Sequence, residues 1–300
     1  MKNVLDRIGA GEILVADGAM GTMLHERGID ISRCVEAVNL SHPEILEEIA
    51  RLYLEAGAEI IQTNTFGASP LKLSMYSLES KTEEMIQKAV SAVRTAIDGK
   101  AYISGSCGPS GKMLKPYGDV EPVIMFGSFK RQMKALIESG VDIICIETMT
   151  DIAEATLAVR AVREISSSIP IMATMTFDAT PRGFFTIMGT DIKEAAAELE
   201  KAGANIIGSN CGNGIENMVG IAREFKKHTI LPLIIQSNAG LPVLKEGKLF
   251  YPETPEFMAE KAKELISLGI SIIGGCCGTT PAHIAAIRKL IDSRSSRRIR

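Results

Sequence analysis

The sequence predicts a single domain of the α/β class, a TIM-type (β/α)8 barrel. Eight short runs of apolar and β-branched residues each end in a cluster of Gly, Asn, Ser or Thr, and amphipathic helical segments separate them. Strands that alternate with helices indicate a parallel sheet. Eight such units in 300 residues fit a closed barrel, which typically needs about 250 residues.

The eight strand segments share an apolar core and turn-forming residues at their C-terminal ends. They are expected at residues 13–16, 59–62, 101–105, 142–147, 171–176, 205–209, 233–237 and 271–274. Barrels of this kind carry their active sites at the C-terminal ends of the strands. Functional residues are therefore expected in the loops that follow these eight segments.

Helical periodicity fills the intervals between the strands. Ile45, Ile49, Leu52, Tyr53 and Ala56 follow the spacing of one buried helical stripe. Four helical segments end in a glycine just before the next strand, within EAGAEII, ESGVDII, KAGANII and SLGISII, where a helix commonly stops with positive φ. A doubly wound open sheet is the alternative, but neither GxGxxG nor GxxxxGK[ST] follows the first strand.

One barrel is expected over residues 1–292, followed by a basic tail or the start of a linker at 293–300. The longest loop-like stretch, residues 179–189, is too short for a domain boundary. The net charge of −3 does not favour nucleic-acid binding, and no apolar run reaches the roughly 18 residues of a membrane span. The N-terminus lacks the apolar region of a signal peptide. We therefore expect a cytoplasmic protein with reduced cysteines.

Three cysteines follow predicted strands. Cys211 follows the sixth strand in GSNCGNG, and Cys276 and Cys277 follow the eighth in GGCCGTTP. Three thiolates suit Zn²⁺, and a site with three protein ligands leaves a position for a substrate, as catalytic zinc sites do. Neighbouring residues of a strand point to opposite faces, so the glycines of GGCCG must let the backbone turn if both cysteines bind one ion.

Other interpretations of these cysteines remain open. The adjacent pair could form a disulfide, all three could be buried and inert, or one could act as a nucleophile, although no histidine lies at a strand end to assist it. The other cysteines, Cys34, Cys107 and Cys145, are expected to be structural.

Polar residues at three further strand ends are candidates for substrate binding. Asp17 ends the first strand within DGAMGT, and Glu147 ends the fourth. A loop-capping role for Asp17 and a buried ion pair for Glu147 are the alternatives. Asn238 follows the seventh strand, between the two cysteine loops. Its amide oxygen is a candidate metal ligand when substrate is absent, and a turn role is equally compatible.

The motifs DGAMGT, GSNCG and GGCCGTTPAHI resemble those of the homocysteine S-methyltransferase family, and the resemblance extends from Asp17 to His283. With GPSGK and SNAGLP, the sequence is most similar to the N-terminal homocysteine-binding module of the family's cobalamin-dependent members. The resemblance implies that Cys211, Cys276 and Cys277 bind zinc, and that Asp17 and Glu147 bind the ammonium group of homocysteine.

From these residues we expect methyl transfer to the homocysteine thiolate, which forms methionine. Backbone N–H groups of Gly18, Ala19, Met20 and Gly21 are candidates for binding the substrate carboxylate. The expected partners are homocysteine and the cobalamin-carrying and folate-binding domains of a larger enzyme.

The expected methyl donor is methylcobalamin. A quaternary ammonium donor is commonly held by an aromatic cage, whereas this chain has no Trp and few aromatic residues, such as Phe66 and Tyr117, near strand ends. Betaine and S-methylmethionine are the alternative donors. A zinc-binding barrel without catalysis is the alternative function.

Overall fold

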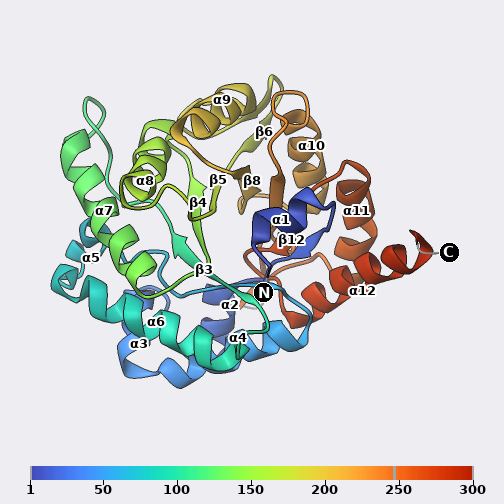
Figure 1. The fold of residues 1–300 in the computed structure, drawn as a ribbon, viewed down its shortest axis with the longest axis horizontal. Coiled ribbons are helices and arrows are strands. Elements are labelled where there is room, and N and C mark those ends of the chain that lie inside the picture. The colour runs from blue at the N-terminus through green and yellow to red at the C-terminus, as the bar shows by residue number, and fades with distance from the viewer. Residues whose placement is uncertain (1, 246–247, 299–300) are drawn as a thin grey trace.

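Eight parallel strands form the centre of the structure, a computed structural model that describes residues 2–245 and 248–298 (Figure 1). In spatial order they are β1 (Leu14–Val15), β12 (Ile272–Gly275), β9 (Leu233–Ser237), β8 (Ile206–Asn210), β5 (Ile171–Met175), β4 (Ile143–Met149), β3 (Tyr102–Cys107) and β2 (Ile60–Gln62). A parallel bridge between Ala16 and Ile60 brings the two ends of this order together. The predicted barrel is therefore confirmed, and each predicted strand overlaps an observed one.

Helices surround the strands, as Figure 1 shows. They are α1 (Val4–Gly9), α2 (Met20–Glu26), η1 (Val35–Ala37), α3 (Val38–Ser41), α4 (Pro43–Glu55), α5 (Pro70–Ser74), η2 (Glu79–Lys81), α6 (Thr82–Ile97), α7 (Pro122–Glu138), α8 (Ile152–Ile165), α9 (Ile192–Ala202), α10 (Ile215–Phe225), α11 (Pro255–Ser267) and α12 (Pro281–Arg298). The glycines predicted to end four of them, Gly57, Gly140, Gly203 and Gly269, all have positive φ, between 73° and 107°. No helix within these described ranges is long and apolar enough to cross a membrane.

Alternate residues of each strand point to opposite faces of the sheet. The barrel therefore has two apolar layers, one between the strands and the helices and one inside the barrel. Val15, Ile61 and Ile144 pack outward against the helices in the larger core. Leu14 and Ile60, their neighbours in sequence, belong to a second cluster in which residues from all eight strands fill the barrel. The interior is therefore packed at this level, and a ligand pocket can form only closer to the ends of the strands.

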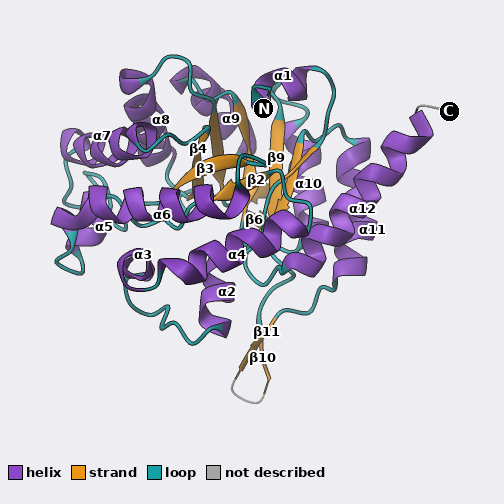
Figure 2. Ribbon diagram, turned by 60° about the horizontal axis from the view of Figure 1, so that its bottom comes forward, coloured by secondary structure: helices purple, strands orange, loops and turns teal. Residues whose placement is uncertain are grey.

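Two β-hairpins were not predicted from the sequence. β6 (Asp178–Thr180) pairs with β7 (Gly183–Phe185) inside the stretch expected to be a loop, and β10 (Val243–Lys245) pairs with β11 (Lys248–Phe250). Figure 2 shows the β10–β11 hairpin projecting at the end of the molecule opposite α1.

The last helix, α12, continues to Arg298, so residues 293–298 of the expected tail are helical. Residues 299–300 lie outside the described part of the chain. The start of a linker at this end stays a prediction.

Candidate metal centre and substrate pocket

The three predicted metal ligands meet above the barrel. Cys211 directly follows β8, Cys276 and Cys277 directly follow β12, and β9 lies between these two strands. The three Sγ atoms lie within 4.8 Å of one another, and those of Cys211 and Cys277 are 3.8 Å apart. All six cysteines are free thiols, so the structure contains no disulfide between Cys276 and Cys277.

The backbone turns sharply at both cysteine loops. Cys211 has a φ of +61°, and its N–H donates to the Gln236 carbonyl of β9. After β12, the Thr279 N–H donates to the Cys276 carbonyl, which closes a tight turn. A Cβ atom on Gly275 would lie 2.2 Å from Thr279 Oγ1, so this turn requires glycine. The chain thereby leaves strand geometry where the sequence predicted it must.

The protonation state of each of the three thiols depends on that of the other two. Hydrogen bonds donated by Cys276 and Cys277 lower the pKa of Cys211 to about 3. The same hydrogen bonds and the neighbouring Cys211 thiolate raise the pKa of Cys277 to about 12 and that of Cys276 well above its usual value. One negative charge is thus favoured without a cation, and a bound dication would displace the remaining protons.

This donor set fits Zn²⁺. Three converging sulfur atoms are the ligands that zinc prefers, and Asn238 lies beside them. Its side chain hydrogen-bonds to Cys211, and its buried Oδ1 has no hydrogen-bond partner among residues 2–245 and 248–298. A buried amide oxygen normally has a partner, so a cation at this position would satisfy an atom that the protein leaves unpaired.

The two predicted carboxylates lie buried beside this centre. Asp17 is 2% exposed and Glu147 is 7% exposed. Asp17 Oδ2 accepts from the Gln62 N–H at 2.8 Å, whereas its buried Oδ1 has no partner in the described ranges. Glu147 Oε1 accepts from Ser106 Oγ, and Oε2 accepts from Asn210 Nδ2 at 3.3 Å.

Burial disfavours the ionised form of both carboxyl groups. Burial and, to a smaller extent, the nearby charge of Glu147 together raise the pKa of Asp17 to about 8, although the hydrogen bond from the Gln62 N–H opposes the shift. Burial likewise raises the pKa of Glu147 to about 7, although Ser106 and Gln62 stabilise its charge. No described cation forms a salt bridge with either group. Both carboxyl groups therefore lack a counter-charge among the described residues, which a bound cation would supply.

A pocket of about 300 Å³ is lined by the three cysteines and by Glu147. Its lining includes Gly18, Ala19, Met20, Gly21, Glu147, Cys211, Cys276 and Cys277. The Ala19 N–H, a predicted donor to substrate carboxylate, instead donates to Thr279 Oγ1 at 3.2 Å. The structure thus brings the cysteines and Glu147 to one cavity, while Asp17 and Asn238 lie next to it.

Three polar residues that contact Glu147 were not predicted from the sequence, and two of them, Gln62 and Ser106, line the pocket. Gln62, Ser106 and Asn210 each end or nearly end a strand and contact Glu147 through their side chains. The same strand-end criterion that singled out Glu147 could have found them.

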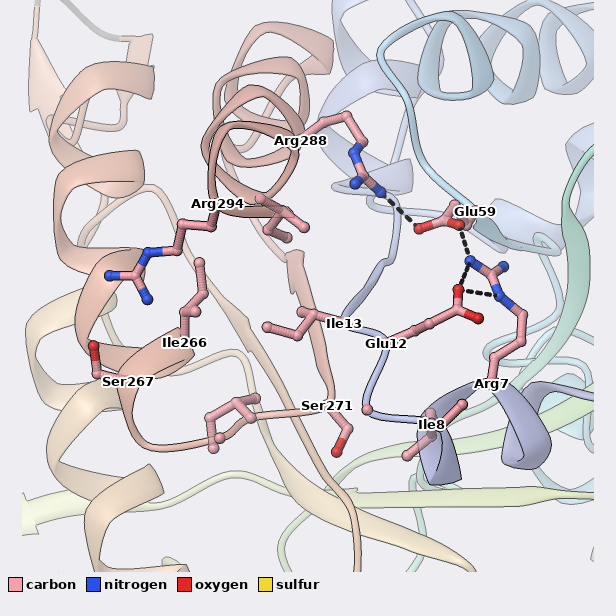
Figure 3. Close-up of a pocket in the computed structure, with 15 residues that line it drawn as sticks. Arg7, Ile8, Glu12, Ile13, Glu59, Ile266, Ser267, Ser271, Arg288 and Arg294 are labelled. Atoms are coloured by element: carbon pink, nitrogen blue, oxygen red, sulfur yellow. Dashed lines mark hydrogen bonds and ion pairs between the residues drawn. The ribbon is translucent and has the colours of Figure 1, made fainter. Parts of the chain in front are cut away.

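A larger cavity, of about 630 Å³, lies at the N-terminal end of the barrel (Figure 3). Its walls include Glu59 and Ser271, which precede β2 and β12. Arg7 and Arg288 both contact the Glu59 carboxylate, at 2.5 and 2.8 Å. None of the predicted site residues lines this cavity, so the candidate site is the smaller pocket at the other end of the strands.

Known proteins resemble the chain along most of its length. Methionine synthase of Mycobacterium leprae (strain TN) is 33% identical over 295 residues, which cover 93% of this chain and 24% of the relative. Methionine synthase of Mycobacterium tuberculosis is 33% identical over 292 residues, with 92% and 24% covered. The chain therefore spans about a quarter of the length of these relatives.

Among solved structures, the metallated form of the homocysteine methyltransferase MmuM from Escherichia coli superposes with a TM-score of 0.79 at 24% identity. The match covers 96% of this chain and 99% of that one. The carboxyl transferase domain of Rhizobium etli pyruvate carboxylase, at 16% identity and a TM-score of 0.53, covers 93% of this chain and 46% of its own. These two similarities support the barrel fold.

A family model described as homocysteine S-methyltransferase matches residues 14–291. The match includes both cysteine loops, Asp17 and Glu147. On this match and the 33% identity to two methionine synthases, the chain belongs to the homocysteine S-methyltransferase family.

Proposed function

We propose that this chain transfers a methyl group from methylcobalamin to the sulfur of homocysteine, with Zn²⁺ held by Cys211, Cys276 and Cys277. The proposal rests on one observation, that the cluster of three cysteines and a buried carboxyl group lie at the same pocket. Three Sγ atoms within 4.8 Å of one another border a pocket that also contains the buried carboxyl group of Glu147. Homocysteine offers one group to each feature, a thiol and an ammonium.

The metal's contribution is to lower the pKa of the substrate thiol, so that a nucleophilic thiolate exists at neutral pH. The protein's own residues bind and orient the rest of the substrate. Glu147 and Asp17 receive the ammonium group, and the charge of the ammonium favours the ionised form of both carboxyl groups. Backbone N–H groups of Gly18, Met20 and Gly21 are the candidates that remain for the substrate carboxylate.

The proposed reaction is a nucleophilic displacement at the methyl carbon of the donor. The homocysteine sulfur forms a bond to the methyl carbon, the bond between that carbon and the donor breaks, and its electron pair leaves with the donor. A fixed amino-acid end limits the directions in which the sulfur can point, which is how positioning lowers the barrier of a two-substrate reaction.

Two observations support methylcobalamin as the donor over betaine or S-methylmethionine. The motifs GPSGK and SNAGLP resemble those of the family's cobalamin-dependent members, and the two relatives at 33% identity are methionine synthases. Against betaine in particular, the described lining of the pocket contains a single aromatic side chain, Phe66, whereas cages for quaternary ammonium groups such as that of betaine use several. The cobalamin-carrying and folate-binding domains of a larger enzyme are the partners that this donor implies.

A donor comparison tests the proposal. The zinc-loaded chain is incubated with homocysteine and with methylcobalamin, betaine or S-methylmethionine separately, and methionine is quantified over time. A Cys276→Ala variant serves as the control for uncatalysed transfer. We expect the fastest formation with methylcobalamin. Faster formation from either small donor would overturn the donor assignment, and no methionine from any donor would overturn the catalytic role.

A further inference from the structure

The side chain of Asn210 contacts both halves of the site. Its Nδ2 lies 3.3 Å from Glu147 Oε2, 3.9 Å from Cys276 Sγ and 2.8 Å from Thr148 Oγ1. Asn210 is the last residue of β8 and is fully buried. It directly precedes Cys211 in the chain, so one buried amide lies between the carboxylate proposed for the ammonium and the cysteines proposed for the metal.

The orientation of this amide is fixed by its oxygen. Asn210 Oδ1 accepts from the Thr148 N–H and from Thr174 Oγ1, each at 2.7 Å. Reversing the amide would place its NH₂ group against the Thr148 N–H, which can only donate. The NH₂ group must therefore face Glu147, Thr148 and Cys276.

The NH₂ group has fewer hydrogens than acceptors around it. It carries two N–H bonds, whereas a carboxylate oxygen, a hydroxyl oxygen and a sulfur lie within reach. The contact with Thr148 is the shortest of the three. The remaining N–H is therefore shared between Glu147 Oε2 and Cys276 Sγ.

Asn210 also stabilises the backbone next to Glu147, through its hydrogen bonds with Thr148. Thr148 has a φ of +60°, which is a rare conformation for a β-branched residue. The pairing of β4 with β5 also shifts register between Ile146 and Met149. Asn210 binds both the N–H and the Oγ1 of Thr148, so it stabilises the irregular backbone that directs Glu147 into the pocket.

We propose that Asn210 is a positioning residue that couples binding of the substrate's amino group at Glu147 to the state of the metal ligand Cys276. When an ammonium engages Glu147 Oε2, the shared N–H of Asn210 turns to Cys276 Sγ. A thiolate that binds a metal is a better acceptor than a thiol, so metal favours amino-group binding, and the effect is reciprocal by linkage. This inference rests on the proposed function, which supplies both ligands.

The test uses L-norvaline, in which a methyl group replaces the thiol of homocysteine, so that it reaches the amino-acid subsite without binding the metal through sulfur. The chain is loaded with Co²⁺, whose sulfur-to-metal absorption band reports on the cysteine ligands. We expect norvaline to shift this band, and we expect metal to strengthen norvaline binding by about fivefold, a typical coupling between two sites.

Two variants distinguish the proposed coupling from a purely structural role of the hydrogen bonds to Glu147. Asn210→Asp retains an acceptor for Thr148 and Thr174, and once its new carboxyl group is ionised at alkaline pH it cannot donate, so under that condition norvaline should bind without shifting the band, whereas the wild-type band at the same pH should shift. Ser106→Ala removes a different hydrogen bond to Glu147, and its band should still shift. If Asn210→Asp folds poorly, the double variant with Thr148→Gly removes the steric cost of the positive φ and serves in its place.

The outcomes distinguish the coupling from the proposed function. An unmoved band in the wild-type protein with bound norvaline, or an equal shift in Asn210→Asp, would overturn the coupling alone. Failure of the wild-type protein to bind Co²⁺ or norvaline at all would instead count against the proposed function, and the coupling would fall with it.

Discussion

At the scale of single residues, the site is built from groups that the protein alone leaves unsatisfied. Asp17 Oδ1 and Asn238 Oδ1 are buried without hydrogen-bond partners among the described residues, and burial raises the pKa values of both Asp17 and Glu147. Such groups lower stability in the free protein and are commonly found where a ligand supplies the missing partner.

The carboxylates lead to a prediction about affinity. Charge-assisted hydrogen bonds contribute about 1.5–3 kcal/mol each, so Asp17→Asn or Glu147→Gln should weaken homocysteine binding by roughly one to two orders of magnitude. Calorimetric titration of the zinc-loaded variants measures this change, and zinc content should remain that of the wild type. Unchanged affinity in both variants would remove these residues from the ammonium site.

Asp17 also leads to a prediction about pH. Its pKa rises from 3.8 to about 8 on folding, so the folded protein resists ionisation of this group and loses stability as the pH increases between these values. The slope is up to about 1.4 kcal/mol per pH unit. We expect metal-free Asp17→Asn to match the wild type near pH 4 and to be more stable near pH 8, as measured by chemical denaturation. A difference between the two proteins that does not grow with pH would contradict the buried ionisation.

At the scale of elements, the positions of the strand ends could be predicted from the sequence, and most of the candidate site residues follow from them. The apolar runs and the glycine-rich loops after them fixed the ends of the barrel strands within two residues, and this placed Cys211, Cys276 and Glu147 at one end of the barrel. The hairpins escaped prediction because their three-residue strands are shorter than the four to eight residues over which alternation can be recognised. Contacts such as that of Asn210 with Cys276 depend on side-chain directions between distant strands, which no local pattern encodes.

The turn after β12 gives a prediction at this scale. Gly275→Ala would place a Cβ atom 2.2 Å from Thr279 Oγ1, so the turn must shift, at a cost of about 1–3 kcal/mol. Because Cys276 is the next residue, zinc affinity should fall as well. Gly9→Ala is the matched control, since nothing lies within 4 Å of its added Cβ. Denaturation and zinc competition measure both effects, and a Gly275→Ala protein that equals this control would show that the turn tolerates a side chain.

At the scale of the whole molecule, the two ends of the barrel have different roles. At the N-terminal end, Glu59 accepts from Arg7 of α1 and Arg288 of α12, so one carboxylate ties the first and last helices to β2 (Figure 3). At the C-terminal end, the last residues of the strands and the loops after them carry the cysteines and the carboxyl groups. This division matches the general behaviour of the fold, in which one end serves stability and the other serves chemistry.

The central claim is that three cysteines from two loops hold one metal ion for the chemistry of homocysteine. The most direct measurement is the zinc content of purified wild-type protein and of Cys211→Ala, Cys276→Ala and Cys277→Ala, with Cys107→Ala as the control because Cys107 is buried away from the centre. We predict one zinc per chain in the wild type and the control, and loss of zinc in each of the three variants. Full retention of zinc in any two of those variants would contradict the account.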